Sequence, residues 1–457
     1  MSNPWKACDI RGIYPREVAA ELLRRVGASV GSALPAGTRV LIAGDFRTST
    51  PDLKAALAEG LLGSGSHVLD AGQIPTSIAY FAHRHWNTRA VMIVTASHNP
   101  PDYNGLKLMV GELPPTPADF DRLRGQVERG GFRPLLGTIE KLDAVPAYRS
   151  WVLKRWEHLR AAGMAVVLDA GSGAWSVLAP QLFEELGFRV HRLFCEIDGT
   201  FPHRSPDCAR PGSLAPLRRE VVRTGAPLGI AWDGDGDRVA FLDGDSSIVS
   251  TDEVAALLVR ELASREPRAK VVCDIKLSDT VRQAVLAGGE LAIMERSGHA
   301  FIKRAMIEQD CLLGCEASGH YFFRELNGGD DGLFAGLLMA ELLIRHGIPL
   351  AELCRTLEPF YATPDLRIPA GVLSFAEIVR RLRSLFKGAP ETDIDGIRLE
   401  TEAGYILARQ SVTEPVVTMR LEGRRREALS ELVQVCLNAF PEAAEEISRQ
   451  IDQTRVA

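Results

Sequence analysis

The chain alternates short apolar runs with longer amphipathic stretches, and one such order occurs three times. Each copy starts with an apolar run that ends in an aspartate before a polar turn, at 40–45, 166–169 and 271–274. Short apolar runs bounded by turn residues are typical of buried strands, and the amphipathic stretches that follow are typical of helices. The pattern therefore predicts three copies of one mixed α/β unit.

Each predicted unit continues with two further strands and a polar loop. After the helix we expect a second strand, at 67–69, 189–194 and 291–294. A third apolar run then ends in a polar loop, and an apolar return strand leaves this loop, at 106–110, 239–242 and 321–323. Because α/β sheets bind ligands at the ends of their strands, each unit is expected to present one functional loop.

The last part of the chain follows a different plan. Pro359, Pro364 and Pro369 punctuate the stretch after the third unit, and a capping-box sequence from Ser374 to Glu377 then precedes an amphipathic helix. We therefore expect an α/β protein with three topologically similar mixed α/β domains plus a C-terminal α+β domain. The predicted boundaries are 1–145, 146–247, 248–360 and 361–457.

The first polar loop reads Thr-Ala-Ser-His-Asn-Pro at 95–100 and follows the apolar run 90–94. A hydroxyl in a short turn after a buried strand is held rigidly yet stays accessible, as a nucleophile requires. His98, beside Ser97, can exchange a proton with a reacting oxygen, and Pro100 stiffens the exit of the turn. Ser97 is therefore a candidate nucleophile, although an ordinary polar turn would have the same composition.

The second polar loop reads Asp-Gly-Asp-Gly-Asp-Arg at 233–238, directly after the apolar run 228–232. Carboxylates at alternate positions repel one another by about 1 to 4 kcal/mol per close pair, depending on the local dielectric. The intervening glycines permit positive φ, so Asp233, Asp235 and Asp237 can converge. Oxygen ligands favour a hard cation, with Mg²⁺ the first candidate, and a solvated acidic turn is the alternative.

The third polar loop reads Gly-Cys-Glu-Ala-Ser-Gly-His at 314–320. Glu316 can accept hydrogen bonds, and Ser318 can donate or accept them. Two such residues, bracketed by glycines, suit the recognition of adjacent hydroxyl groups.

The three loops together resemble the signatures of the α-D-phosphohexomutases, which carry a phosphoserine loop, an aspartate-rich metal loop and a sugar loop in this order. Within that family the chain looks like the phosphomannomutase/phosphoglucomutase branch. The resemblance extends from Asp-Ile-Arg-Gly at 9–12 to Arg-Gln-Ser-Val-Thr-Glu-Pro at 409–415. It implies that the four domains surround a central active-site cleft and serve, in chain order, phosphoserine, metal, sugar and phosphate binding.

The resemblance implies an enzyme that interconverts hexose 1-phosphate and hexose 6-phosphate, of mannose, glucose or both. Ser97 would be phosphorylated in the resting enzyme, and a hexose 1,6-bisphosphate would be both intermediate and activator. Asp233, Asp235 and Asp237 would hold Mg²⁺ together with a phosphoserine oxygen of Ser97, and Arg238 would add a fixed positive charge. The bisphosphate would turn end over end, so that its other phosphate returns to Ser97.

Such a turn requires a site that accepts the sugar in two orientations. Glu316 and Ser318 are expected to bind the 3- and 4-hydroxyls, which exchange places approximately when the sugar turns. General acid/base catalysis is assigned first to Lys107, with His98 and His320 as further candidates. The other substrate-binding residues that the resemblance implies are Arg11, Lys276, Ser297, Gly298, His299, Arg409, Ser411 and Thr413, of which the last three would bind the non-reacting phosphate.

Three residues depart from the family pattern. Val412 stands where Asn or Gly is usual, Cys8 replaces a Tyr, and Cys315 replaces a Gly. None of these changes removes a reacting group. They bear on affinity and substrate choice, and the expected class of reaction is unchanged.

Three other functions are weighed against this one. A phosphoglucosamine mutase of the same fold typically has Glu-Gln-Ser where this chain has Glu-Ala-Ser at 316–318. A metal-dependent phosphosugar phosphatase with a serine nucleophile needs an open, wet site, whereas the loop that carries Arg409 implies closure over a retained intermediate. A non-catalytic phosphosugar-binding protein is expected to have lost Ser97 or one of the three aspartates, and all four are present.

The composition of the chain limits the classes of partner that we expect and agrees with a phosphohexomutase-like enzyme. The 457 residues carry a net charge of −6, which argues against a general role at nucleic acids or membrane surfaces. Eight scattered cysteines and an N-terminus without a signal-peptide pattern favour a reduced, cytoplasmic protein. We expect small-molecule hexose phosphates as partners, with no nucleic acid and no membrane, and we expect a monomer, with a dimer as the alternative.

Overall fold

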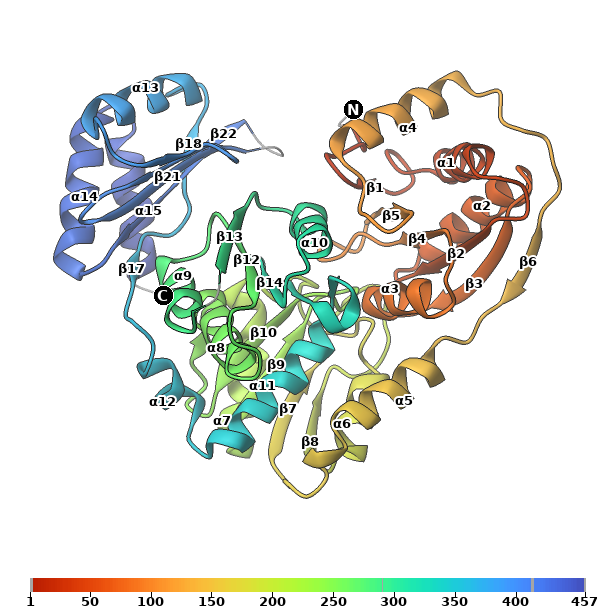
Figure 1. Ribbon diagram of the computed structural model, residues 1–457, viewed down its shortest axis with the longest axis horizontal. Helices are drawn as coiled ribbons and strands as arrows, with labels where there is room; N and C mark the ends of the chain where they lie inside the picture. The colour runs from red at the N-terminus through yellow and green to blue at the C-terminus, as the bar shows by residue number, and fades with distance from the viewer. Residues whose placement is uncertain (1–2, 290, 412–414, 456–457) are drawn as a thin grey trace.

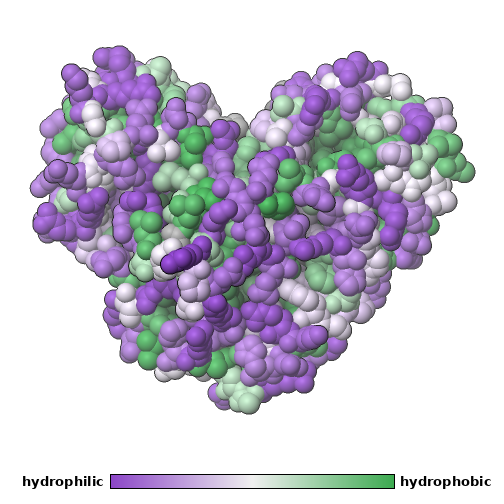
Figure 2. All heavy atoms as spheres, viewed as in Figure 1, coloured by the Kyte–Doolittle hydropathy of each residue, from purple (hydrophilic) through white to green (hydrophobic). Residues whose placement is uncertain are grey.

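The computed structural model of the chain describes residues 3–289, 291–411 and 415–455. Four sheets, each with its helices, follow one another along the chain. In Figure 1 the N-terminal domain lies at the upper right, the second and third domains lie in the lower centre, and the C-terminal domain lies at the upper left. Figure 2 shows that a notch separates the two upper lobes on this face of the molecule.

The first sheet has six strands in the order β1-β5-β4-β2-β3-β6. All five residues of β4 are buried, as expected for a central strand that is covered on both faces. The strands are β1 (Ile10–Ile13), β2 (Arg39–Gly44), β3 (His67–Gln73), β4 (Ala90–Val94), β5 (Tyr103–Val110) and β6 (Thr138–Lys141), and the helices are α1 (Ala20–Ala33), α2 (Thr50–Leu62), α3 (Thr76–His85) and α4 (Pro117–Arg129).

The second sheet has five strands in the order β11-β10-β9-β7-β8, and all five residues of its central strand β9 are buried. The strands are β7 (Ala165–Asp169), β8 (Arg189–Leu193), β9 (Leu228–Trp232), β10 (Val239–Asp243) and β11 (Ile248–Val249). The helices are α5 (Val145–Arg155), α6 (Leu178–Glu185) and α7 (Ala215–Thr224), with short 3₁₀ turns η1 (Glu157–Leu159) and η2 (Pro211–Leu214).

The third sheet has five strands in the order β13-β12-β14-β15-β16. The strands are β12 (Lys270–Asp274), β13 (Leu291–Glu295), β14 (Leu313–Cys315), β15 (Tyr321–Phe323) and β16 (Gly329–Asp330). The helices are α8 (Thr251–Ala263), α9 (Asp279–Ala287), α10 (His299–Glu308), α11 (Gly332–His346) and α12 (Leu350–Arg355), with a 3₁₀ turn η3 (Arg324–Leu326).

The three sheets share one strand plan, which confirms the prediction of three similar units. In each, the first strand (β2, β7 or β12) lies between two parallel neighbours, and the third strand is followed by an antiparallel return strand. The three polar loops therefore follow equivalent strands, namely β4, β9 and β14. This plan brings chemically different loops to the same kind of sheet edge.

The C-terminal domain is an antiparallel sheet with three helices, which confirms the expected α+β domain. Its first helix begins as predicted, because Ser374 Oγ accepts a hydrogen bond from the N–H of Glu377 at 3.2 Å. The strands are β17 (Tyr361–Ala362), β18 (Leu366–Pro369), β19 (Glu391–Thr392), β20 (Ile397–Glu400), β21 (Gly404–Gln410) and β22 (Val416–Gly423), and the helices are α13 (Phe375–Leu385), α14 (Arg426–Ala439) and α15 (Ala444–Arg455).

Among the described residues, the apolar core has three main parts, one of which lies within the N-terminal domain and includes Leu53 and Val94. Another buried cluster runs through the first three domains and includes Leu41, Trp175 and Leu337. A separate cluster fills the C-terminal domain and includes Ile378 and Leu432. Within the described ranges, no helix combines the length and the apolar composition that a bilayer span requires.

Candidate active site

Ser97 lies in the turn after β4 with a backbone φ of 51°. Residues other than glycine seldom adopt this conformation, so the surroundings must hold the turn in place. The N–H of Ser97 donates to Thr95 Oγ1 at 2.9 Å, and the Thr95 hydroxyl donates to Asp45 Oδ2 at 2.7 Å. The candidate nucleophile is therefore fixed by a short chain of hydrogen bonds to the end of β2.

Arg47 is fully buried beneath this turn and holds it by backbone carbonyls. Its guanidinium donates to the carbonyl oxygens of Ser97 at 2.9 Å, Asn99 at 2.6 Å and Pro100 at 2.5 Å. Its Nε donates to Asp45 Oδ2 at 3.1 Å. Arg47 was not predicted from the sequence, because the carbonyls that it binds lie about fifty residues further along the chain.

Asp233, Asp235 and Asp237 follow β9 and converge, with one carboxylate oxygen from each within 4.8 Å of the others. All three side chains are buried. The φ of Gly236 is 84°, and a Cβ at this position would stand 2.4 Å from Trp175 Nε1. Trp175 Nε1 donates to the carbonyl oxygen of Gly236 at 2.7 Å, so the loop can close in this way only with glycine here.

Residues of the N-terminal domain contact the same carboxylates. Lys107 Nζ, on β5, donates to Asp235 Oδ2 at 2.8 Å and also to Asp237. Thr76, at the start of α3, donates its hydroxyl hydrogen to Asp235 Oδ2 at 2.8 Å. The second oxygen, Asp235 Oδ1, is buried and has no hydrogen-bond partner among the described residues.

These observations fit a hard cation at the aspartate loop. Burial and the two neighbouring carboxylates raise the pKa of Asp233 well above its usual value. A divalent cation would offset this repulsion, and it would find an unused buried oxygen on Asp235. The donor set consists of oxygens, which suits Mg²⁺.

The serine turn and the aspartate loop meet although they are far apart in the sequence. Ser97 Oγ donates to Asp233 Oδ2 at 2.9 Å. His98 Nδ1 lies 3.3 Å from Ser97 Oγ, and Arg238 Nε lies 4.0 Å from Asp233 Oδ2. Burial, together with the charge of Arg238, lowers the pKa of His98, so its ring is neutral at pH 7.

His320 joins the third loop to the aspartate loop. Its Nδ1 lies 2.8 Å from Ser318 Oγ and 3.1 Å from Glu316 Oε2. Its Nε2 lies 3.2 Å from Asp237 Oδ1. Burial alone would lower the pKa of His320, but the nearby carboxylates outweigh burial and raise it to about 10. The structure thus brings the candidates of all three loops into one contiguous group.

The candidates at the start of α10 lie beside this group. Gly298 is the N-cap of α10 and His299 is its first residue, and the rings of His299 and His320 are 6.2 Å apart. Burial lowers the pKa of His299 to about 4. Lys276, after β12, pairs with a carboxylate of the C-terminal domain, because its Nζ lies 3.3 Å from Asp365 Oδ2.

The remaining candidates lie near the two ends of the chain. Arg11 Nη1 donates to Asn99 Oδ1 at 3.1 Å, which places Arg11 beside the serine turn. Arg409, near the end of β21, donates from Nη2 to Asp395 Oδ2 at 2.5 Å. Ser411 follows β21, and its N–H donates to the carbonyl oxygen of residue 416 at 2.9 Å. The predicted contact residue Thr413 and the departure Val412 lie outside the described residues.

Known proteins share both the sequence and this arrangement. Models of the phosphoglucomutase/phosphomannomutase α/β/α domains I, II and III match residues 5–133, 146–246 and 250–360. The chain is 33% identical over 439 residues to the phosphomannomutase/phosphoglucomutase of Pseudomonas aeruginosa, and the match covers 95% of this chain and 94% of that protein. The chain belongs to this family, the α-D-phosphohexomutases.

Two further relatives agree with this membership of the phosphohexomutase family. A phosphoglucomutase of Neisseria meningitidis serogroup A is 34% identical over 438 residues, with 94% of each chain covered. The crystal structure of a phosphoglucomutase/phosphomannomutase family protein from Burkholderia thailandensis matches with a TM-score of 0.88 and 33% identity, over 97% of each chain. These matches confirm the resemblance and the class of enzyme, an isomerase of the phosphotransferase type that acts on hexose phosphates.

The sequence carries a further signal for residues that support the candidate site. An aspartate ends or directly follows the first strand of each unit, and all three of these aspartates organise a loop. Asp45 accepts from Thr95 and Arg47, and Asp274 accepts from Ser297 Oγ at 2.6 Å and from the N–H of Ala317 at 3.1 Å. In the second unit, Asp169 accepts from Arg204 Nε at 2.8 Å.

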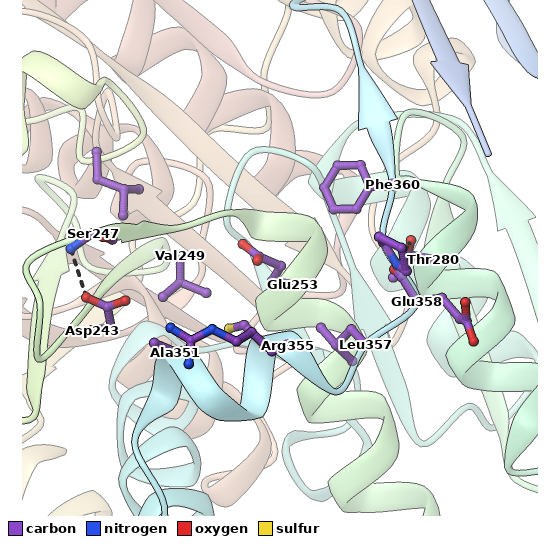
Figure 3. A pocket seen from close by; sticks show the side chains of 13 residues that line it. Asp243, Ser247, Val249, Glu253, Thr280, Ala351, Arg355, Leu357, Glu358 and Phe360 are labelled. Atoms are coloured by element: carbon purple, nitrogen blue, oxygen red, sulfur yellow. Dashed lines mark hydrogen bonds between the residues drawn. The ribbon is translucent and has the colours of Figure 1, made fainter. Parts of the chain in front are cut away.

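The pocket in Figure 3 is separate from this candidate site. It has a volume of about 500 Å³ and is lined by residues of the β10–β11 hairpin, α8, α9, α12 and the segment 357–360. Arg355 and Glu253 contribute charged side chains to it, and Phe360 contributes a ring. Among the described residues, none of the candidate catalytic or substrate-binding side chains lines this pocket, so it is distinct from the candidate active site.

Proposed function

We propose that the protein reversibly interconverts hexose 1-phosphate and hexose 6-phosphate, of mannose, glucose or both. The reaction would proceed through a phosphoserine at Ser97 and a bound hexose 1,6-bisphosphate, which also serves as the activator. One observation carries this proposal: Ser97 Oγ lies 2.9 Å from Asp233 Oδ2, so the candidate nucleophile adjoins the group of three carboxylates. Phosphoryl transfer depends on alignment and on neutralisation of charge, and this contact supports both.

The charges around Ser97 suit phosphoryl transfer. Asp233, Asp235 and Asp237 would hold Mg²⁺ together with a phosphoserine oxygen, and the bound ion would neutralise charge on the transferring group. Arg238 lies beside Asp233, and Lys107 bridges Asp235 and Asp237. Because Lys107 is committed to two carboxylates, we assign it to charge neutralisation in preference to proton transfer.

His320 is placed best to donate a proton to an oxygen of the sugar. It contacts Ser318 of the sugar loop on one side and Asp237 of the aspartate loop on the other. Because its pKa is raised to about 10, the imidazole is protonated at pH 7, and in this position it can serve as a general acid between the sugar and the reacting phosphoryl group. His98, 3.3 Å from Ser97 Oγ, remains a second candidate close to the nucleophile.

The substrate would bind through a sugar contact and a phosphate contact. Glu316 and Ser318 would hold the 3- and 4-hydroxyls in both orientations, and Arg409 with Ser411 and Thr413 would hold the non-reacting phosphate. The other predicted contacts, which surround these, are Arg11, Lys276, Ser297, Gly298 and His299. Binding at both ends would retain the bisphosphate while it turns.

The organisation of the enzyme is part of the same proposal. We assign the phosphoserine domain to 1–145, the metal domain to 146–247, the sugar domain to 248–360 and the phosphate domain to 361–457. A cytoplasmic location and a monomeric state, with a dimer as the alternative, remain our expectations. None of these assignments changes the chemistry proposed for Ser97.

An assay with several sugar phosphates tests the proposal against its alternatives. The purified protein, with Mg²⁺ and a catalytic amount of hexose 1,6-bisphosphate, would receive the 1-phosphates of glucose, mannose and glucosamine, and the products would be followed by phosphorus NMR. Conversion of glucose and mannose 1-phosphate to the 6-phosphates is the expected result. Release of inorganic phosphate would indicate a phosphatase, and turnover of glucosamine 1-phosphate alone would indicate a phosphoglucosamine mutase.

A further inference from the structure

Asp395 connects the C-terminal domain to the third domain through a single carboxylate oxygen. It lies between β19 and β20, and its Oδ2 accepts from Arg409 Nη2 at 2.5 Å and from the backbone N–H of Ser297 at 3.2 Å. Both side chains are shielded, with 14% of Arg409 and 21% of Asp395 exposed. One oxygen therefore links the candidate phosphate-binding arginine to the loop before α10.

The pairing leaves part of the Arg409 guanidinium without a hydrogen bond among the described residues. Arg409 Nε is buried and has no hydrogen-bond partner among the described residues. A guanidinium that is fixed along one edge by a carboxylate presents its other N–H groups in a defined plane. Asp395 thus fixes the orientation of the guanidinium, and the exposed part of this side chain can meet an incoming anion such as a phosphate.

The connection continues from Ser297 into the sugar loop. Ser297 Oγ donates to Asp274 Oδ1 at 2.6 Å, and Asp274 Oδ2 accepts from the N–H of Ala317 at 3.1 Å. Ala317 lies between the two candidate sugar-binding residues Glu316 and Ser318. A continuous series of contacts therefore runs from Arg409 through Asp395, Ser297 and Asp274 to the sugar loop.

We propose that Asp395 is a positioning residue that sets the separation between Arg409 and the sugar loop. This inference rests on the proposed function, in which Arg409 binds the non-reacting phosphate and the sugar loop binds the ring hydroxyls. A hexose phosphate has a fixed distance between these two groups, and it must match the site in both orientations. Asp395 holds Arg409 and the sugar loop at a fixed separation and does not touch the reacting atoms. Its role is therefore to help retain the bisphosphate while it turns.

The test compares Asp395→Asn with Asp393→Asn. Asp393 is an exposed carboxylate two residues earlier in the same segment, so its substitution controls for loss of one negative charge. Asp395→Asn keeps an oxygen acceptor and the side-chain volume but loses the charge-assisted hydrogen bond. We expect KM for the hexose phosphate to rise about 10- to 100-fold and the fraction of turnovers that release free bisphosphate to rise as well. Asp393→Asn should match the wild type in both measurements.

A double-mutant cycle with Arg409→Ala shows whether Asp395 acts through Arg409. Adding Asp395→Asn to Arg409→Ala should change KM less than about three-fold further, because the residue that it positions is already gone. Full additivity of the two substitutions would overturn the proposal. A lower KM in Asp395→Asn would also overturn it, since the carboxylate would then be competing with the substrate phosphate.

The same data separate this inference from the proposed function. If Arg409→Ala has a wild-type KM, the assignment of the phosphate-binding residue is wrong, and the inference fails with it. If Arg409→Ala raises KM but Asp395→Asn behaves like Asp393→Asn, the phosphate-binding residue stands and the positioning role is wrong. Phosphorylation of Ser97 by added bisphosphate, followed by intact-mass analysis, verifies that each variant retains a folded transfer site.

Discussion

A Cβ at Gly234 would stand 2.6 Å from the carbonyl oxygen of Ser97. Real Cβ atoms do not approach a backbone oxygen so closely, so the two loops touch through backbone atoms with no room for a side chain. The same proximity allows Asp233, the neighbour of Gly234, to accept the hydrogen bond from Ser97 Oγ. The serine turn and the aspartate loop therefore depend on each other for their positions.

Gly234→Ala should separate these loops and slow turnover. Because a misplacement of about 1 Å at a reacting group can cost roughly 100-fold, we expect kcat to fall about 10- to 100-fold. The matched control is Gly212→Ala, because a Cβ at Gly212 would meet nothing within 4 Å. Steady-state kinetics of the two variants decide the matter, and equal activity in both would show that the contact does not constrain the site.

Ser97→Ala should lower kcat of the mutase reaction by at least about three orders of magnitude, because it removes the only proposed phosphoryl acceptor. The wild-type protein should carry a phosphate adduct that maps to Ser97, and the variant should not. Intact-mass analysis and peptide mapping provide these measurements, and circular dichroism verifies the fold. Near-normal turnover in Ser97→Ala would show that the reaction does not pass through this residue.

Asp235→Asn should be nearly inactive, because it weakens both cation binding and the balance of charge around Lys107. In the wild type, chelation with EDTA should abolish activity and Mg²⁺ should restore it. Calorimetric titration with Mg²⁺ should show a loss of affinity in the variant, which is a readout independent of turnover. Full activity after exhaustive chelation would exclude a metal requirement.

The pH dependence of stability should reflect Asp331, which caps α11. Asp331 accepts from the N–H groups of Leu333 and Phe334 and from the hydroxyl of Tyr148 at 2.6 Å. Burial raises the pKa of Asp331 to about 7, whereas an unfolded aspartate titrates near 4. Between about pH 4 and pH 7 the folded protein retains a proton that the unfolded chain releases, so this contribution to stability falls as pH rises through that window.

The variant Asp331→Asn keeps a capping oxygen but cannot ionise. The midpoint of thermal unfolding of the wild type, minus that of the variant, should therefore be larger at pH 5 than at pH 8. Differential scanning calorimetry at the two pH values measures this difference. An unchanged difference would mean that Asp331 does not titrate in this range.

Substrate breadth should follow from the residues that contact the sugar. Glu316 and Ser318 are assigned to the 3- and 4-hydroxyls, where glucose and mannose are identical, and no identified residue is committed to position 2. Without a buried polar partner for that position, the two 1-phosphates should differ by no more than about ten- to thirty-fold in kcat/KM. Competition between the two substrates gives this ratio directly. A preference of about a thousand-fold would reveal a residue that reads position 2.

The strands and the three loops could be predicted because their signals are local. Apolar runs at 90–94 and 228–232 end at the loops that contain Ser97 and Asp233, and each of these short segments is informative by itself. The common strand plan also followed from the pattern, because the same order of runs occurs three times. The aspartate-rich loop could be predicted to bind a cation, because three neighbouring carboxylates repel one another without one.

The residues that hold the loops in place could not be predicted in the same way. Arg47 binds carbonyls about fifty residues away, and Asp395 meets Ser297 across a domain boundary. Such contacts depend on how the sheets and domains pack, which no short stretch of sequence encodes. Lys107 was identified, but its commitment to Asp235 and Asp237 emerged only from the fold, and this shifts the proposed acid/base role to His320.

The division of the apolar core allows the C-terminal domain to unfold more independently than the other three domains. The C-terminal domain has its own buried cluster, and Ile275, Tyr405 and Leu407 form the small cluster that joins it to the third domain. A unit with an independent core can open or unfold before its neighbours. Under mild denaturation we therefore expect the C-terminal domain, with Arg409, to unfold while the loops of Ser97 and the three aspartates stay folded. Such a protein would still transfer phosphoryl groups but would release its bisphosphate intermediate to solution.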